Sequence, residues 1–85
     1  MSKSRAFVLH LLKQAGPAGI NTLEFRQRGA ISPAPRILEL REAGFDILAT
    51  DEFVPAHLSP DGVAHEGIAR YRLISEPRKE GEAQR

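Results

Sequence analysis

The spacing of apolar side chains changes at Gly44. Before this residue, apolar side chains recur every three or four positions, which is the period of an α-helix with one buried face. After it they alternate with polar side chains, which is the period of a β-strand with one buried face. The pattern therefore predicts helices in the first half of the chain and strands in the second.

The first predicted helix covers residues 4–15 and ends at Gly16 and Pro17, which interrupt a helical pattern. Its apolar stripe consists of Phe7, Val8, Leu11, Leu12 and Ala15. Residues 18–20 then form a short extended link, and we expect Ile20 to add one or two rungs to a sheet.

A second helix is predicted over residues 22–28. Asn21 and Glu24 have the spacing of a capping box, in which each side chain bonds a free backbone N–H of the other residue. Gly29 accepts the left-handed conformation that ends a helix. Leu23 and Phe25 are the expected buried residues of this helix.

A third helix is predicted to begin after Ser32, which would cap it, and to stop at Gly44. Pro33 takes the first helical position, where a missing N–H costs nothing. Its expected buried residues are Ile37, Leu40 and Ala43. Only residues 29–32 separate the second and third helices, so the two must cross at a steep angle, as in a helix-turn-helix.

Two strands are predicted over residues 45–50 and 68–74. Between them, residues 59–62 read Ser-Pro-Asp-Gly, which is a strong turn signal. Residues 51–67 are therefore predicted to form the long loop of a hairpin. The order of elements predicts an α+β fold, a winged helix-turn-helix with three helices and a C-terminal β-hairpin wing. Its expected core is formed by Phe7, Leu11, Leu23, Ile37, Leu40, Phe45, Tyr71 and Leu73.

Composition fits one small domain, which we place at residues 4–74, followed by a disordered tail at residues 75–85. The hydrophobic fraction of 41% supports one core and argues against wholesale disorder. Cysteine is absent, and no apolar run approaches the ~20 residues that span a bilayer. The apolar stretch near the start contains His10 and closes at Lys13, unlike a signal peptide. We expect a cytoplasmic protein.

Charge is distributed unevenly, although the net charge is only +1. Residues 1–46 contain seven Lys and Arg against four Asp and Glu. Residues 47–67 contain four Asp and Glu and no Lys or Arg, and residues 68–74 add two Arg. The helical half and the last strand are therefore basic, and the predicted wing is acidic.

Three segments carry a pattern of ordered motifs: Thr22-Leu23-Glu24, Arg36-Ile37-Leu38-Glu39-Leu40-Arg41-Glu42-Ala43-Gly44-Phe45-Asp46-Ile47, and Ala69-Arg70-Tyr71-Arg72-Leu73. In order and spacing they resemble the small winged helix-turn-helix proteins common in bacteriophages and prophages. The resemblance implies a transcriptional regulator that binds double-stranded DNA with the second helix of its helix-turn-helix. The alternative is a winged helix used for protein–protein contact, because a fold alone does not decide between these functions.

Candidate DNA-binding residues are Arg26, Arg28, Ser32, Arg36, Arg70 and Arg72. We expect the first two to contact phosphates from the end of the second helix. Ser32 and Arg36, at the start of the third helix, are placed to contact base edges or a phosphate.

Each candidate also has a structural interpretation. Arg36 can pair with Glu39 or Glu42 instead of DNA, and we weigh the two interpretations equally. Arg70 and Arg72 share one face of the last strand, where they either contact the DNA backbone or form a charged surface that discourages aggregation. 

No catalytic, metal or cofactor motif is present. His10, His57 and His65 lack the spacing of metal ligands, and no nucleophile, base and acid occur at a recognisable spacing. We therefore expect neither enzyme activity nor a small-molecule substrate.

Four apolar side chains remain after the core is assigned: Leu9, Leu38, Leu48 and Ile74. Leu48 and Ile74 should lie on the sheet face opposite Ile47 and Tyr71. We expect them to support a homodimer or a protein partner, and the alternative is that the tail or wing covers them.

Overall fold

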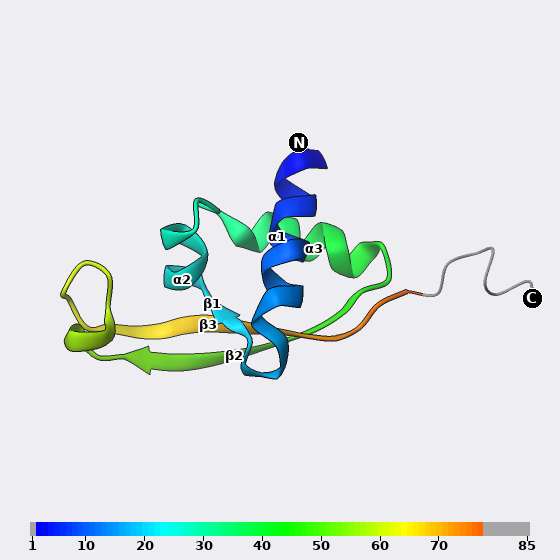
Figure 1. The fold of residues 1–85 in the computed structure, drawn as a ribbon. Helices are drawn as coiled ribbons and strands as arrows, with labels where there is room; N and C mark the ends of the chain where they lie inside the picture. Colours follow the sequence, from blue (N-terminus) through cyan, green and yellow to red (C-terminus); the bar gives the residue numbers. More distant parts are fainter. Residues whose placement is uncertain (1, 78–85) are drawn as a thin grey trace, which may run out of the picture.

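Three helices lie on one side of a three-stranded antiparallel sheet in the computed structural model, which describes residues 2–77 (Figure 1). The helices are α1 (Ser2–Ala15), α2 (Thr22–Gln27) and α3 (Pro33–Glu42). The strands are β1 (Ile20–Asn21), β2 (Asp46–Val54) and β3 (His65–Ser75). Two short 3-10 helices, η1 (Gly16–Ala18) and η2 (Ala56–Leu58), complete the order of elements. The predicted α+β class, three helices and C-terminal hairpin are confirmed.

Strand β3 is the central strand, because the sheet has the order β1-β3-β2. Ile47 of β2 pairs with Leu73, and Ile20 of β1 pairs with Tyr71, all in antiparallel register. Tyr71 therefore shares one face of the sheet with Ile20 and Ile47, and all three are buried. The prediction that Ile20 adds rungs to the sheet is confirmed.

The predicted capping box at the start of α2 is also confirmed. The Glu24 N–H donates to Asn21 Oδ1 at 2.8 Å, and the Asn21 N–H donates to Glu24 Oε1 at 2.8 Å. The α2 helix ends at Gln27, and Gly29 has a φ of 98°. This conformation is open to glycine because it has no Cβ, so the predicted stop at Gly29 is confirmed.

The start of α3 differs from its prediction in one respect. Pro33 is the first helical residue, as predicted, but the Ser32 side chain makes no capping hydrogen bond. A serine cap accepts from the N–H of the second or third helical residue, and the third is Pro35, which has none. The predicted Ser32 cap was therefore wrong. The helix stops before Gly44, whose φ is 103°.

One core joins α1, α3 and the sheet. Its buried members are Val8, Leu11, Leu12, Ile20, Phe25, Ala30, Ile37, Leu40, Ile47 and Tyr71. Phe45 and Leu73 are only partly buried against it, and Ala43 is exposed. The placement of Phe7 in the core was wrong, because its side chain is 38% exposed near the N-terminal end of α1, which projects past α3 (Figure 1).

The hairpin strands are longer than predicted. Pairing continues beyond a register shift between Glu52 and Val54, so the loop shrinks from the predicted 51–67 to residues 55–64. Ser75, placed at the start of the predicted tail, belongs to β3. The disordered tail was predicted over residues 75–85, of which residues 78–85 lie outside the described residues. We call residues 51–68, the far end of the hairpin, the hairpin arm.

Helix α2 buries side chains on two sides. Phe25 is fully buried in the core, whereas Leu23 is buried outside it and lines a cavity together with Val54 of the hairpin arm. Val54 is only 6% exposed, although the sequence placed it in a loop. The hairpin arm therefore packs against α2, and pairing with β3 carries β2 to Val54.

We expect Leu40→Ala to lower the free energy of unfolding by about 2–5 kcal/mol, because it removes buried methyl groups and leaves a cavity. Leu40 is 2% exposed, whereas Leu38 on the same helix is 57% exposed. Leu38→Ala is the matched control and should change stability by no more than ~0.5 kcal/mol. Urea denaturation measures both values, and equal losses would contradict the described packing of α3.

Candidate nucleic-acid interface

The turn between α2 and α3 is held by bonds to α2. The Ala30 N–H donates to the Phe25 carbonyl at 2.9 Å, and Ala30 itself is buried. Arg26 Nε donates to the Ile31 carbonyl at 3.1 Å. Arg26 is exposed and lies beside the turn, as its candidate role requires, but part of its bonding capacity serves the turn itself.

The outer face of α3 is open. Ile37 and Leu40 are buried toward the core, whereas Pro35, Leu38 and Glu42 are exposed. The division of this helix into an inner and an outer face was predicted correctly from its 3.6-residue period. The surface that would enter a DNA groove is therefore accessible.

In the structure, Arg36 forms an ion pair, which was one of its two predicted roles. Its Nη2 lies 2.8 Å from Glu39 Oε2, and its Nε is buried without a hydrogen-bond partner among the described residues. The guanidinium is therefore only partly satisfied in this conformation. A phosphate or base edge that offers acceptors to Arg36 competes with a single carboxylate.

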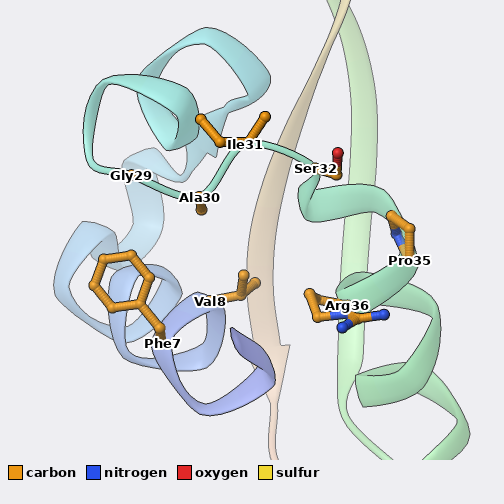
Figure 2. Close-up of a pocket in the computed structure, with 8 residues that line it drawn as sticks. All are labelled: Phe7, Val8, Gly29, Ala30, Ile31, Ser32, Pro35 and Arg36. Carbon is orange, nitrogen blue, oxygen red and sulfur yellow. The ribbon is translucent and has the colours of Figure 1, made fainter. Parts of the chain in front are cut away.

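A cavity of about 340 Å³ opens between α1 and α3, beside the turn (Figure 2). Its lining residues are Phe7, Val8, Gly29, Ala30, Ile31, Ser32, Pro35 and Arg36. Figure 2 shows Phe7 and Val8 on one side of it, with Pro35 and Arg36 on the other. Two of the candidate residues, Ser32 and Arg36, thus lie on one rim at the start of α3.

The start of α3 is a weaker anion site than its helix dipole suggests. Pro33 and Pro35 have no N–H, so within the first four positions only Ala34 and Arg36 can donate from the backbone. Contacts to a phosphate at this end therefore depend on side chains.

Among the candidate cations, Arg28 has no side-chain hydrogen bond or ion pair to the described residues. Its side chain is exposed just beyond the end of α2, and it forms no ion pair within residues 5–77. Together with Arg26 it gives the end of α2 two exposed positive charges.

Arg70 belongs to a different environment, an ionic cluster under the hairpin. Its Nε donates to Glu52 Oε1 at 2.8 Å, and its Nη1 donates to the Ala18 and Gly19 carbonyls, each at 3.1 Å. The same Nη1 lies 3.5 Å from Glu24 Oε1. With its side chain 17% exposed, Arg70 is a structural residue rather than a free phosphate ligand.

The cluster shifts two pKa values in the directions expected of a paired acid and base. The hydrogen bond from Arg70 lowers the pKa of Glu52, although burial opposes the shift. The same bond raises the pKa of Arg70. Asn21 Nδ2 donates to Glu52 Oε2 at 2.8 Å, so both carboxylate oxygens are bonded. No local pattern of residues indicates this cluster, because Glu52 was predicted to lie in the loop.

Arg72 lies on the face of the sheet turned away from the helices. Its Nη1 donates to Thr50 Oγ1 at 3.2 Å, and it pairs across the ladder with Leu48. Leu48 and Ile74, on this same face, are 48% and 57% exposed. The prediction that Arg70 and Arg72 share a face agrees with the register. Arg70 reaches the start of α2 through Glu24, and within the described residues neither arginine bonds the turn or α3.

The tip of the hairpin is an ordered acidic turn. The Gly62 N–H donates to the Ser59 carbonyl at 3.1 Å, which confirms the predicted turn. Hydrogen bonds from the Ser59 hydroxyl, the Val63 N–H and His65 lower the pKa of Asp61 to about 2. The carboxylate is therefore charged at neutral pH, where it repels a phosphate.

Two further features bear on the predicted functions. Among residues 2–77 there is no group of three or more His, Cys, Asp or Glu arranged to hold a metal ion. Within the same described part of the chain, no helix has the length and apolar character needed to cross a bilayer.

Comparisons of this chain with protein-family models, with curated proteins and with solved structures gave no match. The resemblance to phage winged helix-turn-helix proteins therefore stays a prediction.

We expect Arg70→Gln to lower the free energy of unfolding at pH 7 by about 1–3 kcal/mol, because it leaves Glu52 partly buried without its cation. The pKa of Glu52 is lowered in the folded state, so its stabilising effect is present above the ordinary pKa of glutamate. That effect is lost as the pH falls through the lowered value. Urea denaturation should therefore show a smaller loss at pH 3 than at pH 7.

Arg72→Gln is the matched control for this experiment, because Arg72 occupies the same strand and face but bonds only a hydroxyl among the described residues. Its effect should stay within ~0.5 kcal/mol at both pH values. An Arg70→Gln effect that is independent of pH would contradict a stabilising pair with Glu52.

Proposed function

We propose that this chain is a winged helix-turn-helix protein that binds double-stranded DNA and acts in the cytoplasm as a phage or prophage transcriptional regulator. One observation carries the proposal. The chain runs helix, strand, helix, turn, helix and hairpin with sheet order β1-β3-β2, and it leaves the outer face of α3 exposed. A helix exposed in this way can enter the DNA major groove.

The proposed contacts centre on four of the six candidate residues. Arg26 and Arg28 lie at the end of α2 and are proposed to contact phosphates, which position a protein without reading sequence. Ser32 and Arg36 lie at the start of α3 and are proposed to contact base edges. Exposed Leu38 on the same helix suits an apolar contact with a thymine methyl group.

A second candidate function is protein–protein recognition, and the hairpin arm favours it. Residues 47–67 contain four Asp and Glu and no Lys or Arg, so a DNA backbone is repelled there. In this alternative the fold is kept while α3 makes no productive DNA contact.

For the DNA proposal, we expect Arg28→Glu to weaken binding to a mixed-sequence duplex of about 30 base pairs. Each lost phosphate contact should reduce the slope of log affinity against log salt by about one unit. Fluorescence anisotropy at 50 and 200 mM salt measures both effects. Arg28→Glu is preferred to a change at Arg26, because Arg26 also holds the turn.

Lys13→Glu is the charge-matched control. Lys13 is exposed near the end of α1 and pairs with Glu76, away from the turn. It should leave the salt slope unchanged, whereas Arg36→Gln should alter the ranking of duplex sequences. A wild-type chain without measurable duplex affinity at low salt would contradict the DNA proposal and favour protein–protein recognition.

We also propose, as a separate point, a homodimer through Leu48 and Ile74, the exposed apolar side chains on the open sheet face. Sedimentation equilibrium should show concentration-dependent dimerisation of the wild type and a monomeric Leu48→Glu variant. A wild type that remains monomeric at high micromolar concentration, with and without DNA, would contradict the dimer.

A further inference from the structure

A second hollow lies between α2 and the hairpin arm, away from the turn. It has a volume of about 290 Å³ and receives side chains from both elements. Leu23 and Gln27 line it from α2, and Phe53, Leu58 and Pro60 line it from the arm. We call this hollow the arm groove. Its floor is preformed, because Leu23 and Val54 are buried beneath it.

Large apolar side chains are concentrated on the hairpin arm. Phe53 is 58% exposed, Leu58 is 68% exposed and Val63 is 55% exposed. A single exposed apolar residue is ordinary in a folded protein. Here three such side chains fall within residues 53–63, and Phe53 and Leu58 line one groove. Such a cluster marks a contact surface.

The charges of the arm groove indicate which kind of partner would bind there. Glu52 lines the groove, and residues 47–67, which include most of the arm, contain four Asp and Glu and no Lys or Arg. Glu24, which also lines the groove, has a side chain that is 46% exposed. Arg70 is the groove's one lining cation, and its charge is already engaged by Glu52 and Glu24. The groove therefore repels phosphate and favours a cationic partner.

From these observations we propose that the arm groove docks a basic polypeptide segment of a partner protein. An apolar side chain of the segment lies between Phe53 and Leu58, where it buries the exposed surface of both. A neighbouring lysine or arginine lays its aliphatic stem along the groove and places its charge beside Glu24. The hairpin arm is thus a protein-binding element, whatever α3 contacts.

The described end of the chain lies far from the groove. Its last described residue, Pro77, approaches Gly44 at the opposite end of the sheet from the arm (Figure 1). A second copy offering its basic α2 end would make a head-to-tail contact, which forms a closed ring or an open filament and is therefore visible as self-association. The charge of the groove fits a basic segment of a different protein, and this is the occupant we propose.

The test uses the full chain, immobilised, and a displayed library of random twelve-residue peptides. Selected peptides are then measured against three proteins by fluorescence anisotropy: the wild type, a Phe53→Ser/Leu58→Ser variant, and a Leu38→Ser/Leu48→Ser control. All four positions are exposed, so both variants should fold, which circular dichroism verifies. The control likewise removes two exposed apolar side chains, but from other faces.

We expect the selected peptides to be rich in lysine and arginine and to contain an aromatic or aliphatic residue. Their affinity should fall about tenfold or more on the Phe53→Ser/Leu58→Ser variant and stay unchanged on the control. Glu24→Gln, which keeps an acceptor for the capping box, should weaken the same peptides and reduce their dependence on salt. Duplex DNA affinity should be the same for the Phe53→Ser/Leu58→Ser variant and the wild type. The experiment therefore tests peptide binding in the arm groove independently of the proposed DNA binding.

Several results would overturn the proposal. These are a selection that yields no binding peptide, peptides without cationic enrichment, and peptides that bind the arm variant as well as the wild type. Weaker duplex DNA binding by the arm variant would instead make the arm a DNA contact. Self-association that is abolished in the arm variant would make a second copy the occupant.

Discussion

The hydrogen bonds that meet at Glu52 join segments of this structure that lie far apart in the chain. Glu52 accepts from Arg70 with one carboxylate oxygen and from Asn21 with the other. Arg70 in turn bonds the carbonyls of Ala18, at the end of η1, and of Gly19, and Asn21 caps α2. Strands β2 and β3, the link after α1 and the start of α2 are therefore fixed by one partly buried cluster. Such a pair adds little net stability. It disfavours other arrangements of these segments, because separating the two residues leaves a partly buried charge without a partner.

That cluster sets the position of the helix-turn-helix on the sheet. Asn21 is only 4% exposed and serves two partners at once, since its Oδ1 caps α2 while its Nδ2 bonds Glu52. The direction in which α2 leaves the sheet is fixed by these bonds. The Arg26 bond to the Ile31 carbonyl then holds the turn that leads into α3. The exposed face of α3 is thus positioned by contacts made at the other end of α2.

The surface is divided electrostatically between two faces of the same small helix. One end of α2 carries Arg26 and Arg28, whereas the groove on its other side is bordered by the acidic, apolar hairpin arm. Because Leu23 and Phe25 point to opposite sides of α2, the helix is buried against both the core and the arm. Arg26 lies where the two surfaces meet, because it lines an adjoining hollow together with Leu23, Gln27, Pro60 and Asp61. The surface suited to phosphate therefore centres on Arg28 and the start of α3, and the surface suited to a cationic segment centres on the arm groove.

Local signals in the sequence determined the elements themselves: the capping box at Asn21 and Glu24, the glycine stops at Gly29 and Gly44, and the change of period after α3. These signals depend on neighbouring residues, so they are readable without a fold. Tertiary structure decided the rest, because it depends on residues far apart in the chain. Pairing with β3 carried β2 to Val54, which lies beside Leu23 of α2, and the pairing of Arg70 with Glu52 took one candidate cation away from DNA. The sequence alone contained both residues of that pair but no local pattern that joins positions 18 residues apart.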